Sequence, residues 1–129
     1  MKICYLYLHR LYGRGSGRYL QTVIEFFKQK NKVFLVYGMK SDLKVLRGIK
    51  KVIPTFPFSL PVYQGRPDIR NAKKISEIPT TRLFELIHGF AYHALKFHER
   101  FKLDIIHANH CSILPYASKL IKDLAEIPY

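Results

Sequence analysis

Apolar residues occur in two kinds of run that alternate along the first part of this chain. Residues 3–8 read ICYLYL and residues 33–37 read VFLVY, which is typical of strands buried on both faces of a parallel sheet. Between them, four apolar residues recur at helical spacing: Leu20, Val23, Ile24 and Phe27. The pattern predicts a strand, a helix over about 17–30 that Ser16 could cap, and a second strand parallel to the first.

The alternation continues to the end of the sequence. The further elements are predicted in chain order as a short basic helix over 41–48, a strand ending near Pro54, a long helix over 80–102, a strand from Asp104 and a last helix over about 113–124. The apolar stripe of the long helix consists of Leu83, Ile87, Phe90, Ala94, Phe97 and Phe101. Five of the seven prolines fall in 54–79, which predicts a long irregular, proline-rich loop.

This order of elements predicts an α/β fold, a Rossmann-like doubly wound parallel sheet, in a single domain over 1–129. The sequence reaches EIPY where the alternation requires another strand, so we expect the domain to be truncated before its next strand. Apolar residues make up 48% of the chain, enough for a packed core and too many for a disordered segment.

The sequence has no run of about 18 apolar residues and no signal-peptide pattern at its start. Its two cysteines, Cys4 and Cys111, sit in apolar stretches far apart, as expected of buried free thiols in a reducing compartment. We therefore expect a cytoplasmic protein.

Basic residues outnumber acidic ones by 22 to 9, a formal net charge of +13. Residues 40–74 alone hold nine basic side chains against two acidic ones, an excess of seven. Such a segment attracts polyanions, whether nucleic acid, an anionic bilayer or a phosphorylated substrate. A solvated basic face without a partner is the alternative.

The stretch GRGSGR, residues 13–18, joins the first predicted strand to the first helix. Backbone N–H groups at such a junction favour an anion, so Gly15, Ser16, Gly17 and Arg18 are candidate diphosphate-binding residues. The stretch is not a Walker A loop, and it lacks both the glycine spacing and the acidic residue after the second strand that a dinucleotide site needs. A structural turn without a ligand is the other interpretation.

The stretch DIIHANHCS begins at Asp104 and lies where the fourth strand should end. Ligands of open α/β sheets bind at the carboxyl ends of strands, so His107, Asn109 and His110 are candidate contacts to sugar hydroxyls or a phosphate. Two histidines three residues apart without a carboxylate fall short of a zinc set, and no Gly-x-Ser-x-Gly elbow is present. We expect no metal and no Ser-His-Asp triad.

Two stretches of the sequence resemble parts of the same protein family. GRGSGRYLQTVIEFF followed by KVFLVYG resembles the first βαβ unit of retaining glycosyltransferases of family 4, and DIIHANHCSILPYASKLIKDLAEIPY resembles a later strand and helix of the same family. Together they cover roughly half of the chain, in the right order. The sequence departs from the family's His-x-His pattern, because Asn109 takes the second histidine's place and His110 follows it.

The resemblance implies the GT-B fold, in which two Rossmann-like domains face each other across a cleft. This chain would be the amino-terminal, acceptor-side domain of a hexosyl-type glycosyltransferase. Its partners would be a nucleotide-sugar donor, an acceptor that we do not identify and a carboxy-terminal donor-binding domain, with no cofactor. The family's Glu-x7-Glu pair belongs to that second domain, so we expect the isolated chain to be inactive.

The resemblance also implies a membrane partner, because such domains often dock on anionic bilayers through basic patches. Residues 40–74 would supply the patch, placing the protein peripherally on the inner face of the membrane. The alternative function is a non-catalytic, basic Rossmann-like module that binds nucleic acid or another polyanion. We expect no specific nucleic-acid recognition, since no RNA-binding motif is present.

Overall fold

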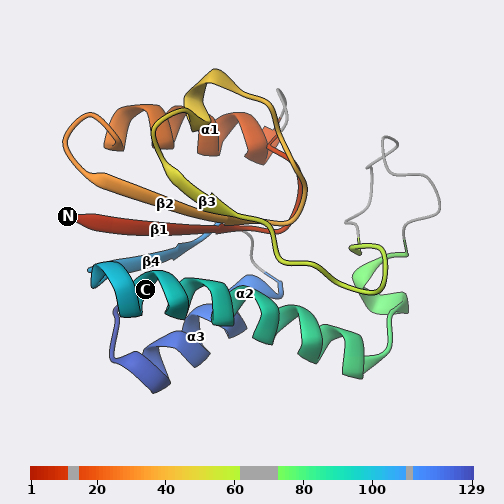
Figure 1. Cartoon of the computed structure of the whole chain (residues 1–129). Coiled ribbons are helices and arrows are strands. Elements are labelled where there is room, and N and C mark those ends of the chain that lie inside the picture. The colour runs from red at the N-terminus through yellow and green to blue at the C-terminus, as the bar shows by residue number, and fades with distance from the viewer. Residues whose placement is uncertain (12–14, 62–72, 110–111) are drawn as a thin grey trace.

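The computed structural model is an α/β fold in which one sheet separates two layers of helices (Figure 1). It describes residues 1–11, 15–61, 73–109 and 112–129. The strands are β1 (Lys2–Tyr7), β2 (Lys32–Tyr37), β3 (Lys50–Val52) and β4 (Ile105–Ala108). The α-helices are α1 (Gly15–Phe27), α2 (Thr80–Phe101) and α3 (Leu114–Ala125), and two 3₁₀ turns are η1 (Lys44–Leu46) and η2 (Ile75–Glu77).

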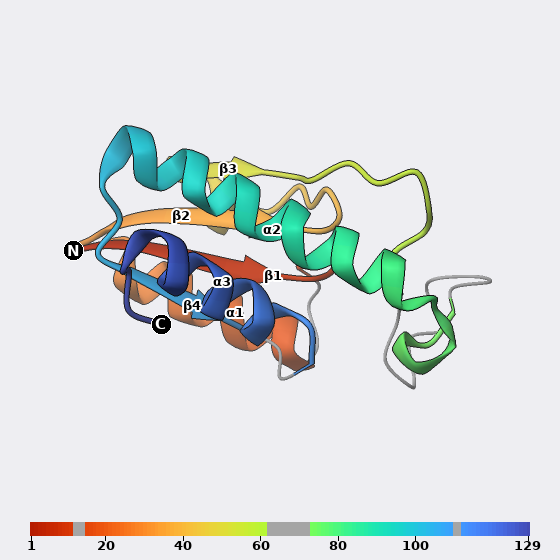
Figure 2. The same cartoon turned by 90° about the horizontal axis from the view of Figure 1, so that it is seen from below.

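The four described strands are all parallel and lie in the order β3-β2-β1-β4. In β1, Ile3 lies opposite Val33 of β2 on one side and Ile105 of β4 on the other. Helix α1 covers one face of the sheet, and α2 and α3 lie side by side on the opposite face (Figures 1 and 2). The predicted Rossmann-like, doubly wound architecture is therefore confirmed.

Alternate residues of β1 belong to two separate apolar layers. Ile3, Tyr5 and Tyr7 face α1, whereas Cys4 and Leu6 face α2 and α3. Both layers are buried, which is why the strand's sequence is continuously apolar. Cys4 is fully buried and free, so the predicted buried free cysteine is confirmed at this position, and its burial raises the pKa of the thiol well above its ordinary value. Cys111 lies outside the described residues.

Two local predictions are wrong. The expected helix over 41–48 is only the single 3₁₀ turn η1, because the chain leaves helical geometry at Arg47 and turns at Gly48 with a φ of 79°. Ser16 does not precede α1 as its cap; the helix already begins at Gly15, whose φ is 57°, and Ser16 lies in the first turn.

The buried face of α2 is wider than its predicted stripe. Phe90 and Ala94 are buried as expected, but Leu86 and Ala91 are buried as well. The reason is that α2 packs against the sheet, through β2 and β1, and also against α3, and each of these contacts needs its own apolar rows.

Two further features complete the architecture. After α3, the Pro128 carbonyl accepts a hydrogen bond of 2.9 Å from the Ile106 N–H, which places the last residues beside β4. No helix in the described part of the chain is long and apolar enough to cross a bilayer.

Candidate functional site

The carboxyl ends of β1 and β4 form the point at which the sheet changes its winding direction. The chain leaves β1 to form α1 on one face, whereas it leaves β4 to form α3 on the opposite face (Figure 1). In doubly wound sheets, this divergence of the connections opens the crevice in which ligands bind. Both stretches singled out in the sequence begin at this point.

Ser16 and Asn109 meet at this switch point although 93 residues separate them in sequence. The Asn109 side-chain N–H donates to the Ser16 carbonyl over a long 3.5 Å. The Asn109 backbone N–H donates to the Leu6 carbonyl at 3.0 Å, which continues the β1–β4 pairing one residue beyond β4. The Ser16 hydroxyl lies 3.2 Å from the Tyr7 hydroxyl at the end of β1. The structure therefore brings together one residue from each candidate stretch.

The other described residues of the glycine turn occupy different environments. Gly17 is buried in the first turn of α1. Arg18 is exposed, and no acidic residue lies in that turn. An anion at this helix end would thus meet backbone N–H groups and a guanidinium with no local carboxylate to repel it. Gly13 and Arg14 lie outside the described residues.

His107 lies within β4, two residues before Asn109. Its ring packs against Tyr5, with centroids 5.3 Å apart and planes inclined by 57°. Partial burial lowers the pKa of His107 below its ordinary value. The pKa of Tyr5 rises to about 12, first because of burial and then because of the nearby Tyr19 hydroxyl. At neutral pH this pair is therefore an uncharged aromatic contact set back from the rim.

Of the two candidate sugar contacts that the structure describes, Asn109 is the one that lies against the glycine turn. His107 lies about 7 Å back toward the start of β4, since it is two residues earlier at the usual rise of a strand. His110 lies outside the described residues. Asn109 therefore places an amide, which can both donate and accept hydrogen bonds, at the carboxyl end of β4.

His9 is a site residue that the sequence reasoning did not single out. It lies two residues after the end of β1 at Tyr7 and is only 1% exposed, so a polar ring is buried close to the switch point. The signal was available, since a histidine placed directly after a fully apolar strand falls at the carboxyl edge of the sheet.

A pocket of about 360 Å³ opens at the carboxyl ends of β2 and β3. It is lined largely by apolar groups of the proline-rich segment, with Phe56, Phe58 and Leu60 among them. Gly38 forms its inner wall and donates its N–H to the Tyr7 carbonyl at 2.9 Å. The sequence did not predict this pocket, because nothing in the spacing of the prolines shows where 54–61 would pack.

Within the described ranges, no three His, Cys, Asp or Glu side chains gather closely enough to hold a metal ion. Comparisons with protein-family models, with curated proteins and with solved structures found no match for this chain. The chemical groups at the carboxyl ends of the strands are therefore the basis for a function. This edge of the sheet combines an anion-favouring helix start, an amide at the rim and an adjoining apolar pocket.

Proposed function

We propose that this chain is the acceptor-side domain of a retaining, nucleotide-sugar-dependent glycosyltransferase of the GT-B type, similar to family 4. The observation that carries the proposal is the contact between the Asn109 side chain and the Ser16 carbonyl at the switch point. It joins the glycine turn and the histidine-containing strand, the two stretches on which the family resemblance rests.

The chemistry of the edge supports a division of roles. The backbone at Gly15, Ser16 and Gly17, together with Arg18, would approach the donor diphosphate or the acceptor, because helix starts and guanidinium groups favour anions. Asn109 would hydrogen-bond a sugar hydroxyl, with His107 and His110 as the other candidates. The apolar pocket beside Phe56 and Phe58 suits an acceptor that carries an apolar group.

Transfer in this proposal requires groups from a second domain, because a departing diphosphate is stabilised by charges from both sides of the cleft. The nucleotide sugar is the donor substrate, and no cofactor is invoked. We expect the purified 129-residue chain to show no turnover. Release of nucleoside diphosphate from a panel of nucleotide sugars, above a no-protein control, would contradict this.

The experiment that tests the proposed site is a residue-resolved titration. The ¹⁵N-labelled chain is titrated with uridine and guanosine diphosphates and with the corresponding nucleotide hexoses, and amide shifts are followed. We expect shifts at Ser16, Gly17 and Asn109. We expect Asn109→Asp, which puts a carboxylate at the rim, to weaken binding by about tenfold. Lys119→Asn, on the exposed face of α3, is the control for altered surface charge.

The proposal fails if none of these ligands shifts residues 15–18 or Asn109. A duplex or single-stranded oligonucleotide that binds tightly at physiological salt would favour the alternative, a polyanion-binding module. Its shifts would then follow the basic surface rather than the switch point.

We further propose that residues 40–74 contact an anionic membrane. The seven basic side chains of this segment that the structure describes are all exposed: Lys40, Lys44, Arg47, Lys50, Lys51, Lys73 and Lys74. These side chains lie at both ends of the strands: Lys40 follows the carboxyl end of β2, whereas Lys50 is at the amino end of β3. Failure to sediment with phosphatidylglycerol vesicles at low salt would rule the membrane contact out.

A further inference from the structure

A second hollow lies at the opposite end of the sheet from the proposed transfer site. It is a pocket of about 540 Å³ at the amino ends of β2 and β3, bordered by the end of α1, the turn before β3 and the end of α2. Its volume is within the usual range of small-molecule sites. We refer to it as the amino-edge pocket.

Cations dominate the polar lining of the amino-edge pocket. Four of its described lining residues are basic, and none is acidic: Lys28, Lys32, Arg47 and Lys50. Lys28 follows α1 and Arg47 follows η1, whereas the other two begin β2 and β3. The four are separated along residues 28–50, so no single basic run produces the cluster. Like charges gathered around one hollow raise the local potential and favour an anion.

The floor of the pocket is apolar. Val33 and Phe34 of β2 are almost fully buried there, and the Phe34 and Phe101 rings lie 5.1 Å apart between centroids. The Lys50 ammonium sits 4.8 Å from the centroid of the Phe101 ring, a cation–π contact. An anionic group and an apolar group of one ligand would therefore find their partners side by side.

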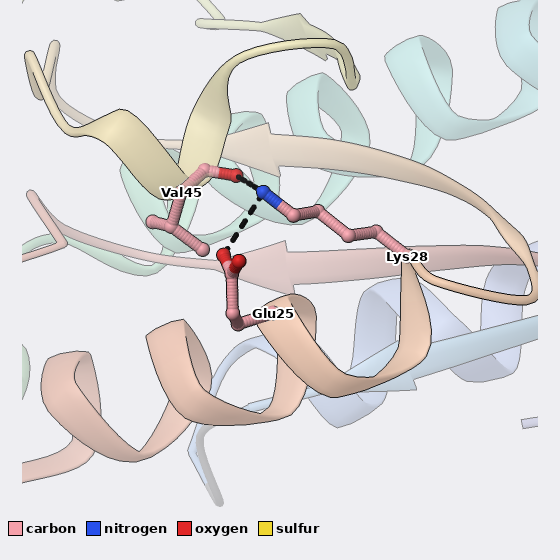
Figure 3. A network of polar contacts seen from close by, with 3 residues as sticks. All are labelled: Glu25, Lys28 and Val45. Carbon is pink, nitrogen blue, oxygen red and sulfur yellow. Dashed lines mark hydrogen bonds and ion pairs between the residues drawn. The ribbon is translucent and has the colours of Figure 1, made fainter.

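The wall that carries Arg47 is fixed by hydrogen bonds from two lysines. The Lys28 ammonium donates a hydrogen bond to the Val45 carbonyl at 3.1 Å and forms an ion pair with the Glu25 carboxylate at 2.9 Å (Figure 3). Lys51 donates to the Leu46 carbonyl at 3.1 Å. The η1 turn is thus held before any ligand arrives, which reduces the entropy cost of binding.

Lys28 and the three other cations of the pocket have different roles. Because Glu25 and the Val45 carbonyl already engage the Lys28 ammonium, Lys28 is a positioning residue. Lys32, Arg47 and Lys50 are exposed and supply the charge that would meet a ligand.

We propose that the amino-edge pocket binds an organic phosphate, an anion that carries an apolar or aromatic group. Phosphate oxygens would accept hydrogen bonds from Arg47 and the two lysines, and the apolar group would lie over Phe101. The site is independent of the proposed transferase function, since it shares no residue with the switch point or with the pocket beside Phe56. A free metabolite and a phospholipid headgroup share this chemistry.

The test uses phenyl phosphate as the probe and inorganic phosphate as the reference, on the full ¹⁵N-labelled chain. We expect phenyl phosphate to shift the amides of Lys32, Gly48 and Lys50, and to bind at least about fivefold more tightly than inorganic phosphate because of the apolar floor. Arg47→Gln and Lys50→Gln should each weaken it by about tenfold. Lys119→Gln, which removes one charge on α3, should change the affinity less than about twofold.

Vesicles distinguish the two sources of the phosphate. Phosphatidylglycerol vesicles that displace phenyl phosphate from these residues, when phosphatidylcholine vesicles do not, identify a headgroup; no displacement identifies a free organic phosphate. The proposal is overturned if about 10 mM phenyl phosphate leaves residues 47–50 unshifted. It is also overturned if Lys119→Gln weakens binding as much as Lys50→Gln does. The wild-type shift map decides the matter even if a variant fails to fold.

Discussion

Gly89 of α2 packs so closely against the ring of Phe56, in the proline-rich segment, that no larger side chain fits between them. A methyl group at Gly89 would lie 2.6 Å from Cε1 of Phe56. The Phe56 ring continues into the core, with its centroid 6.3 Å from that of Phe90. This contact anchors the segment that lines the pocket at the carboxyl ends of β2 and β3, so the glycine serves tertiary packing at the expense of helix propensity.

A double-mutant cycle tests that contact. With Phe56→Ala already present, we expect Gly89→Ala to stabilise the protein by about 1 kcal/mol, the usual helix-propensity gain. In the wild-type background the gain should vanish, because the Phe56 ring must move away. The free energy of unfolding from urea titration is the measurement. An equal effect of Gly89→Ala in both backgrounds would show that the two residues are not coupled.

Gly38 tolerates a side chain even less than Gly89 does, because the nearest group is a backbone carbonyl, which cannot rotate away. A methyl group there would lie 1.7 Å from the Leu8 carbonyl oxygen. We expect Gly38→Ala to destabilise the fold by about 3 kcal/mol or more, since β1 and β2 would have to separate. Gly48→Ala is the matched control: it meets open space, and only its φ of 79° opposes the change, at about 1–2 kcal/mol. Similar losses for both variants in denaturant unfolding would contradict this ranking.

His107 should make stability depend on pH. Burial lowers its pKa in the folded state, so below its ordinary pKa of 6.5 the unfolded chain binds more protons than the folded one. Its contribution to stability is therefore fully present above about 6.5 and declines as the pH falls toward the folded-state pKa. His93, whose pKa burial also lowers, adds a term of the same sign.

The measurement compares urea unfolding of the wild type and His107→Gln between about pH 5 and pH 8. We expect the variant to lose less stability than the wild type on acidification. A ring pKa of His107 at or above 6.5 by NMR titration would remove the basis for the expectation.

Two helices end on residues in the left-handed region without being glycine. Lys102 after α2 has a φ of 55°, and Glu126 after α3 has a φ of 57°. Lys102→Gly and Glu126→Gly should each raise the free energy of unfolding by about 0.5–1 kcal/mol, because glycine adopts this geometry without strain. Arg100→Gly, inside α2, should instead lower it by about 1 kcal/mol. The expectation fails if the end positions behave like Arg100 in thermal unfolding.

The sequence predicted the sheet and helices well because their signal is local. ICYLYL and VFLVY are continuous apolar runs, and short runs of this kind, rich in β-branched and aromatic residues, favour buried strands on their own composition. The helix over 41–48 was predicted wrongly because its three apolar residues, Leu43, Val45 and Leu46, suit one turn as well as two. The chain in fact leaves helical geometry at Arg47 and turns at Gly48, whose φ is 79°.

For the candidate sites too, the local sequence identified single residues but not how the fold brings them together. Ser16 and Asn109 were both singled out, because each belongs to a stretch that comes directly after a strand, but their contact depends on the order of β1 and β4 in the sheet. The amino-edge pocket was not predicted at all. Its cations alternate with unrelated residues over 28–50, and only the packing of α1, β2 and β3 gathers them.

The hydrogen bond between the Ile106 N–H and the Pro128 carbonyl occupies a backbone donor on the outer side of β4. β4 is an outer strand of the sheet, and a bare outer strand is a template on which other chains can add by strand pairing. A donor that is already bonded to the Pro128 carbonyl is not available to a second chain. Part of this outer strand is therefore protected from pairing with other chains.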